Sequence, residues 1–256
     1  MNKKTKTEQL ERLFEEWQQE QINEPKETLD KTMLKDAKIV RFNSFCKDGI
    51  ICEEQFEKEK IKVLFIGNEP NIDNKKDIED WKKGKEFPLV TSQISDFNNY
   101  FDEHHDDWTG KLRQRICEVI YPAMLEPHKN AFPVENGWVN AKKIAFMNLN
   151  KRGGKGNIED HLKNYCNEYK EYIKKEISII NPDIIIWLGK SSFDMCNNTL
   201  FDNNCGQIDN CCFLVKIKDY TIPLILTHHT SSRISSQKRG DIVRVAYDNY
   251  KKSIRK

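Results

Sequence analysis

The sequence predicts an α/β protein of three layers, α/β/α, in which helices cover both faces of a central, mainly parallel sheet of four strands. Four short apolar runs predict these strands, because an uninterrupted apolar run is typical of a strand buried on both faces. The runs are residues 61–67, 143–148, 183–188 and 223–227. Amphipathic helical segments separate them, and alternation of strands with helices favours parallel pairing beneath helical layers.

The composition narrows the classes of function that are open to the chain. It has 256 residues, of which 38% are hydrophobic and 32% charged, and its net charge is only +2. A nucleic-acid contact would therefore need a local basic patch. No run of about 18 uncharged apolar residues predicts a membrane span. The eight cysteines form no C-x-x-C pair, which favours reduced thiols, and we expect a cytoplasmic monomer.

The N-terminal part is predicted to be helical. Residues 7–22 form an amphipathic helix, and Pro25 opens a second, weaker helix that reaches about residue 37. The apolar face of the first helix consists of Leu10, Leu13, Phe14 and Trp17. We expect residues 1–58 to be a helical extension packed on a core domain of residues 59–256.

A long polar stretch, residues 72–107, follows the first strand. A segment of this length without periodicity is often a functional loop. It contains His104-His105-Asp106-Asp107, but four adjacent residues do not converge readily on one metal ion, so we expect a solvated loop rather than a metal site. The next helix is predicted over residues 108–121 and should end at Pro122.

The C-terminal half continues the alternation. A helix is predicted over residues 158–180 and should end at Asn181-Pro182. A short helix then starts near Ser191, after the third strand. Residues 212–217 fit either an edge strand or one arm of a hairpin. The last strand is followed by a closing helix over residues 241–254.

Polar residues follow three of the four predicted strands. These ends are Asn68-Glu69-Pro70-Asn71, Asn148-Leu149-Asn150-Lys151 and the segment from His228 to Arg233. The carboxyl ends of parallel strands meet at one edge of the sheet, where open α/β proteins bind their ligands. A carboxylate, an amide and an imidazole are therefore expected to share one pocket.

These strand ends resemble the motifs of the uracil-DNA glycosylase superfamily over roughly residues 60–250. Gly67-Asn68-Glu69-Pro70 is similar to the first motif, and Asn148 stands where the superfamily places an Asn that reads the base. Residues 182–190 look like the third strand and the start of its helix, and His229-Thr230-Ser231 looks like the second motif. The chain departs from the pattern at Glu69, where members carry Asp, Asn or Ala, and at Thr230, which replaces Pro.

The resemblance implies a monofunctional DNA glycosylase that acts on uracil or a modified base flipped out of DNA. Glu69 would stabilise the oxocarbenium-like sugar and activate water. His229 would donate a hydrogen bond to O2 of the departing base, with His228 as the second choice. Asn68 and Asn148 would bind the base edge.

The resemblance also implies contacts with DNA. Phe87 is the candidate for stacking on the flipped base, and the segment after the last strand is the candidate for phosphate contacts. That segment supplies Ser231, Ser232, Arg233, Lys238 and Arg239. Cys46 and Cys52 do not have the spacing of the iron–sulfur branches, so neither a metal nor another cofactor is expected.

Two other functions are compatible with the sequence. Glu69 and Thr230 also suit a nucleic-acid binding or sensing module that keeps the pocket without the chemistry, for example in defence against foreign DNA. A small-molecule enzyme on a doubly wound sheet, such as a nucleotide hydrolase, is disfavoured because neither common Gly-rich phosphate loop is present.

Overall fold

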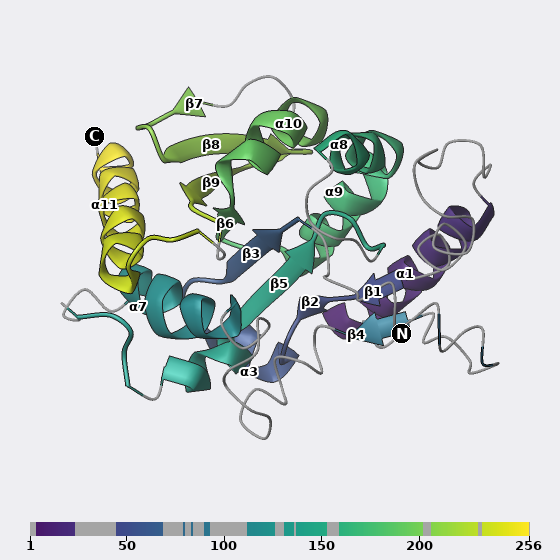
Figure 1. The fold of residues 1–256 in the computed structure, drawn as a ribbon, viewed down its shortest axis with the longest axis horizontal. Helices are drawn as coiled ribbons and strands as arrows, with labels where there is room; N and C mark the ends of the chain where they lie inside the picture. Colours follow the sequence, from purple (N-terminus) through teal and green to yellow (C-terminus); the bar gives the residue numbers. More distant parts are fainter. Residues whose placement is uncertain are drawn as a thin grey trace.

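The computed structural model describes residues 4–23, 45–68, 79, 83, 90–92, 112–125, 131–135, 137–152, 159–201, 206–229 and 232–255. Two sheets are present, one of two strands and one of seven (Figure 1). The strands are β1 (Phe45–Lys47), β2 (Gly49–Ile50), β3 (Val63–Gly67), β4 (Val90–Ser92), β5 (Ile144–Asn148), β6 (Ile184–Leu188), β7 (Gly206–Gln207), β8 (Cys212–Ile217) and β9 (Tyr220–Thr227).

The described helices include one π-helix and one 3₁₀-helix. The π-helix is η2 (Arg115–Ile120) and the 3₁₀-helix is η3 (Gly137–Lys143). The α-helices are α1 (Lys6–Asn23), α3 (Glu53–Lys58), α7 (Tyr121–Leu125), α8 (Glu159–Glu168), α9 (Lys170–Ile180), α10 (Lys190–Leu200) and α11 (Ser236–Ser253).

The seven-stranded sheet has the order β2-β5-β3-β6-β9-β8-β7. Its four central strands, β5, β3, β6 and β9, are the four predicted from apolar runs, and they are parallel. The predicted count of four is wrong for the whole sheet, because β2 joins one side antiparallel and the β8–β9 hairpin carries β7 on the other. The three added strands have two to six residues, and two of them are too short to give a periodic signal.

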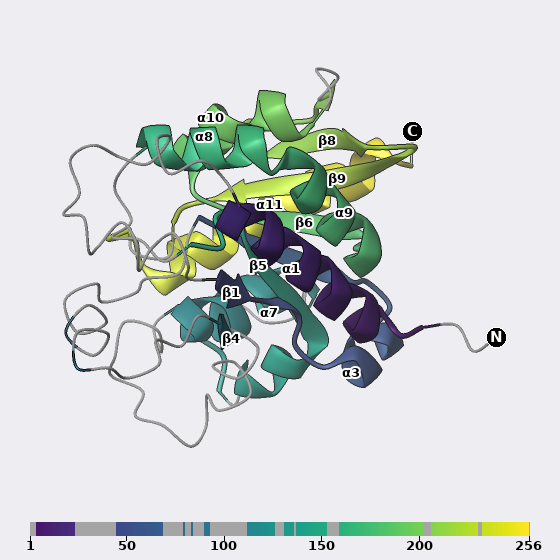
Figure 2. The same ribbon diagram turned by 90° about the vertical axis from the view of Figure 1, so that its right-hand side faces the viewer.

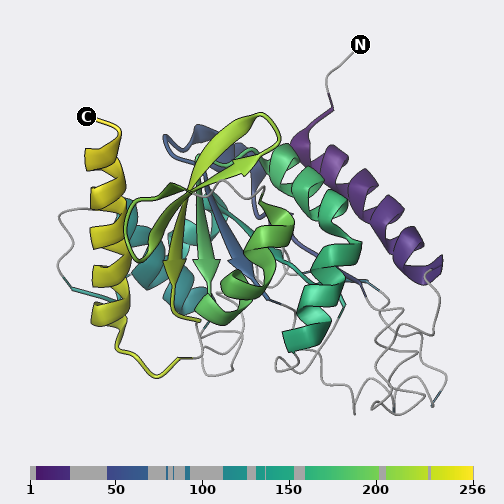
Figure 3. The same ribbon diagram turned by 90° about the horizontal axis from the view of Figure 1, so that it is seen from above.

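Helices cover both faces of this sheet, as predicted. Figure 3 shows α8, α9 and α10 on one side of the strands and α7 and α11 on the other. Each face has its own apolar core. Leu64, Ile185 and Leu224 point toward α9 and α10, whereas Phe65, Ile186 and Ile225 point toward η2 and α11. Both cores bury strand side chains completely, which accounts for the uninterrupted apolar runs.

The N-terminal helix α1 forms the outermost layer on the α9 side and runs across the strands in the view of Figure 2. Its Leu10, Phe14 and Trp17 belong to the same buried core as the strands. Trp17 stacks on Tyr172, with ring centroids 5.4 Å apart. Residues 1–58 also supply β2 to the main sheet, so this segment shares the core instead of resting on its surface.

The helix predicted over residues 108–121 does not end at Pro122. The chain changes from α to π geometry at Arg115 and continues as α7 to Leu125. In the π segment the N–H of Tyr121 donates to the carbonyl oxygen of Ile116. Pro122 therefore occupies the first turn of a new α segment, where the missing N–H is tolerated.

Other boundaries differ in smaller ways. The helix predicted over residues 158–180 is interrupted at Tyr169, whose φ of −104° and ψ of 19° separate α8 from α9. Asn181 then ends α9 in a left-handed conformation with φ 50°. The last helix begins at Ser236, five residues before the expected start, because Ser235 caps it by accepting the N–H of Lys238.

Several predictions fall outside the described residues, namely the whole of the second N-terminal helix and most of the 72–107 stretch. Among the helices that are described, none is long and apolar enough to cross a membrane. None of the described cysteines forms a disulfide bond.

Candidate functional site

The ends of β3 and β5 form the centre of the candidate site. Gly67 and Asn148 are paired in the parallel register of these strands. A Cβ atom on Gly67 would lie 3.0 Å from Oδ1 of Asn148 and 3.1 Å from Cζ of Phe146. The Asn148 side chain therefore occupies the space that a side chain at position 67 would fill, and only Gly leaves room for it.

Asn148 carries an unsatisfied donor. Its residue surface is only 4% exposed, and its Nδ2 has no hydrogen-bond partner among the described residues. A buried amide N–H without a partner costs about 1–3 kcal/mol. Such a group at the ligand-binding edge of a parallel sheet suits a bound acceptor.

Asn68 supplies an acceptor at the same edge. Its Oδ1 is buried and lacks a partner among the described residues. Its backbone carbonyl accepts the N–H of Asn150 at 2.9 Å, and the carbonyl of Gly67 accepts the N–H of Leu149 at 3.1 Å. Parallel pairing thus continues one residue beyond the end of β3. It fixes the backbone around Asn68 and Asn148.

His229 lies over the end of the neighbouring strand β6. Its Cβ and Cδ2 would be 3.6 and 3.7 Å from a Cβ on Gly189, which has a φ of +128°. Burial lowers the pKa of His229 below its ordinary value, and the charges of Arg239 and Arg115 lower it further. The ring is therefore neutral at pH 7 and can donate from one nitrogen. His228, the second choice, is exposed.

Asn148 and His229 are thus brought to one edge of the sheet. Asn148 covers the end of β3 and His229 the end of β6, and these two strands are direct neighbours. Adjacent strands are about 4.8 Å apart. Asn148 and His229 therefore lie over the ends of adjacent strands at the carboxyl edge of the sheet.

Arg239 does not have the predicted role. Its side chain is fully buried. Its Nη1 donates to the carbonyl oxygens of His228 at 2.7 Å and His229 at 3.1 Å, and its Nη2 donates to Ser232. Burial lowers its pKa to about 10, so it stays charged at neutral pH. Arg239 holds the loop that carries His229 and offers no free guanidinium to a phosphate.

The other predicted DNA contacts are placed around the start of α11. Arg233 and Lys238 are exposed, and Ser232 is half-buried. Lys238 lies in the first turn of the helix rather than in a loop. Helix N-termini attract phosphate through free N–H groups and the helix dipole.

Three predicted site residues fall outside the described residues: Glu69, Phe87 and Ser231. Asn68, which precedes Glu69, and Ser232, which follows Ser231, are described.

Two residues at this edge were missed by sequence reasoning. Thr227 ends β9, is 3% exposed, and its Oγ1 has no partner among the described residues. A lone Thr at the end of an apolar strand gives little signal. Arg115 lies in η2, close enough to lower the pKa values of His229 and Arg239. Its proximity arises only from tertiary packing.

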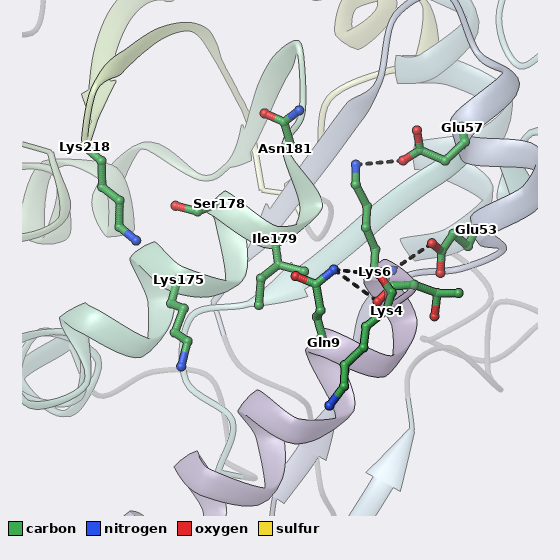
Figure 4. Close-up of a pocket in the computed structure, with 11 residues that line it drawn as sticks. Lys4, Lys6, Gln9, Glu53, Glu57, Lys175, Ser178, Ile179, Asn181 and Lys218 are labelled. Atoms are coloured by element: carbon green, nitrogen blue, oxygen red, sulfur yellow. Dashed lines mark hydrogen bonds and ion pairs between the residues drawn. The ribbon is translucent and has the colours of Figure 1, made fainter. Parts of the chain in front are cut away.

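A separate hollow of about 530 Å³ lies at the opposite edge of the sheet, where the parallel strands begin (Figure 4). It is lined by α1, α3, the end of α9 and the β8–β9 turn. Glu53 accepts the backbone N–H groups of Lys6 and Thr7, both at 2.8 Å, and Lys6 pairs with Glu57 at 2.7 Å. These contacts attach α1 to α3, and the hollow contains none of the predicted site residues.

No protein-family model matches the chain, and no curated protein sequence matches it significantly. Among the described residues, no group of three His, Cys, Asp or Glu side chains is arranged to hold a metal ion. The functional groups in the described part of the site are amides, a hydroxyl and a neutral imidazole. These groups suit a flat heterocycle with carbonyl and N–H edges.

We expect Gly67→Ala to lower the free energy of unfolding by about 1–3 kcal/mol, because the new methyl group overlaps Asn148 and Phe146. Gly206→Ala is the matched control, since its nearest neighbour, Cβ of Leu214, would lie at 3.6 Å. Its effect should stay within about 0.5 kcal/mol. Urea denaturation measures both, and equal effects would contradict the packing of Asn148 over Gly67.

We expect His229 to titrate below its ordinary pKa of 6.5 in the folded protein. The unfolded chain then binds the proton more tightly, so stability is complete above about pH 6.5 and falls as the pH drops toward the folded pKa. NMR titration of the ring measures the pKa, and His229→Gln should remove this part of the pH dependence. A midpoint at or above 6.5 would show that the ring is not held neutral.

Proposed function

We propose that the protein is a monofunctional DNA glycosylase that releases uracil or a modified pyrimidine-like base flipped out of DNA. The observation that carries this proposal is the buried Nδ2 of Asn148, which lies beside Gly67 at the carboxyl edge of the parallel sheet and has no hydrogen-bond partner among the described residues. The resemblance of the strand ends to the uracil-DNA glycosylase superfamily supports the same function.

The base would be read by the two asparagines. A pyrimidine such as uracil presents a carbonyl oxygen, O4, beside a donor, N3–H. The Nδ2 of Asn148 is free to donate to O4, and its Oδ1 can accept from N3–H. The unpartnered Oδ1 of Asn68 is a second acceptor at the same edge. Extruding the base satisfies groups that are otherwise buried without partners, which offsets part of the unstacking cost.

His229 would stabilise the leaving group. Cleavage of the glycosidic bond places negative charge on the base, and a neutral imidazole can donate a hydrogen bond to O2. Arg239 and Arg115 lie near this ring. Burial and, to a smaller extent, these positive charges keep His229 neutral before the reaction, and the charges would favour the anionic base as it forms.

Glu69 would act on the sugar and the water. A carboxylate at this position stabilises an oxocarbenium-like sugar and activates the attacking water, while Phe87 would stack on the base. Lys151, the nearest lysine beyond β5, is fully buried and paired with two carboxyl groups. It is therefore not free to attack the sugar, which supports hydrolysis without a lysine-linked intermediate.

DNA would lie over the start of α11. Exposed Arg233 and Lys238, the hydroxyl of Ser232 and the N–H groups of the first helical turn provide phosphate contacts beside His229. With a net charge of only +2, the chain needs such a local patch to bind a polyanion.

The function is tested by incubating the folded protein with duplex and single-stranded DNA that carries uracil or another modified base at one position. Released base and abasic sites are the expected products on at least one substrate. Folded protein that leaves every substrate intact would contradict the enzymatic activity.

A second candidate is a nucleic-acid binding or sensing module of the same fold. Glu69 and Thr230 favour it, because both depart from the motifs that support catalysis. Tight, salt-dependent binding without base release would support this module, and measurable turnover would exclude it.

We expect Asn148→Ala to lower kcat/KM by about 100-fold or more, because the variant loses the donor and the acceptor that read the base. Asn198→Ala removes an amide from the exposed face of α10 and is the matched control. Steady-state base release measures both variants. Comparable activity of the two would remove Asn148 from the base pocket.

We expect Glu69→Gln to lower turnover by about 100-fold or more, because a neutral amide can neither activate water nor offset the charge of the sugar. DNA affinity should change little, since the shape of the side chain is kept. Single-turnover rates and equilibrium binding separate the two effects. Unchanged turnover would exclude Glu69 from the mechanism.

A further inference from the structure

Three ionisable residues are completely buried beside the backbone of Asn148. They are Asp48, Lys151 and Glu176, each without exposed side-chain surface. The Nζ of Lys151 donates to Oδ1 of Asp48 and lies 2.9 Å from Oε2 of Glu176. The second oxygen of Asp48, Oδ2, accepts the backbone N–H of Asn148 at 2.6 Å.

The α1 helix closes this group from solvent. The Nζ of Lys151 lies 5.4 Å from the ring centroid of Phe14 and 5.3 Å from that of Trp17. Both rings are buried, and the face of an aromatic ring attracts a desolvated cation. The N-terminal helix thus covers the ammonium on the side away from the sheet.

Lys151 keeps its positive charge within this buried group. Burial alone would lower the pKa of Lys151, but Asp48 and Glu176 outweigh it, so that pKa is raised and the amine stays charged. Burial raises the pKa of Glu176 well above its ordinary range, and the attraction of Lys151 offsets only part of this. Lys151 and Asp48 form the closest ion pair of this group.

Stability alone gives little reason for such a group. Replacing a buried ion pair or triad by apolar residues of similar volume is often neutral or stabilising. The contact of this group with the candidate site is the bond from Asn148 N–H to Asp48. A carboxylate fixed by a buried ammonium is a rigid acceptor, and rigid neighbours are what a base-reading amide needs.

We propose that Asp48, held by Lys151 and Glu176 beneath α1, is a positioning residue that orients Asn148 for base selection. This inference rests on the proposed function and extends it, because it makes the N-terminal helix and the Lys47-Asp48-Gly49 turn part of the site. Asp48 acts through the Asn148 backbone and does not touch the base.

The test compares two double variants that both lack the buried ion pair. In Asp48→Asn with Lys151→Met, the amide oxygen still accepts the Asn148 N–H. In Asp48→Leu with Lys151→Met, the volume is similar but the acceptor is gone. The two proteins therefore differ chiefly in the bond to Asn148, and neither retains an unpaired buried charge at these two positions.

Two readouts are taken from each variant. Amide hydrogen exchange of Asn148 should be about tenfold faster in the Leu variant than in the Asn variant, because the N–H has lost its acceptor. The ratio of kcat/KM for the preferred base over a competing base should also fall about tenfold in the Leu variant. A purely structural effect lowers activity on both bases alike and leaves this ratio unchanged.

Equal exchange rates of the Asn148 N–H in the two variants would overturn the inference, as would different exchange rates with equal base selectivity. If wild type releases no base, the selectivity is measured as the ratio of affinities for modified and unmodified DNA. A wild-type protein with neither turnover nor base-dependent binding would overturn the proposed function and this inference together. A selective wild type with equally selective variants would overturn this inference alone.

Discussion

The in-register parallel pairing of β3 with β5 is the constraint on which the candidate site depends. It places Gly67 opposite Asn148, so that the amide has space to lie across the end of β3. The same register carries the chain one residue further, where Asn150 donates to the carbonyl of Asn68. Because β6 and β9 follow in parallel, Thr227 and His229 reach the same edge. The buried apolar strands thus fix the relative positions of the polar groups at their ends.

A buried ionic group lies on each side of this edge of the sheet. On the β5 side, Asp48 and Lys151 neutralise each other beneath α1 and hold the backbone of Asn148. On the β9 side, Arg239 is buried against the carbonyls of His228 and His229, and its charge adds to the burial that lowers the pKa of His229. Asn148 and His229 are therefore each supported by a buried ionic group, which favours a rigid arrangement of these two residues.

The sequence was sufficient for the central strands, because a run such as Val63–Gly67 is apolar at successive positions only when both faces are covered. It also placed Asn68, Asn148 and His229 at one edge, since parallel strands share their direction. It could not identify β7, whose two residues carry no pattern, or the passage of a helix through Pro122. The burial of Arg239 and of Asp48 was equally hidden, because long-range partners decide whether a charged side chain is solvated.

The most direct measurement of the central claim is a crystal structure of the protein bound to DNA that carries uracil on a sugar with an uncleavable glycosidic bond. We expect the base to lie outside the helix, with its edge at about 2.7–3.2 Å from Nδ2 of Asn148. We also expect His229 to lie beside O2 and phosphates to lie over the first turn of α11. A base that remains stacked in the duplex, or that is bound away from Asn148, would contradict the assignment of this edge as a base pocket.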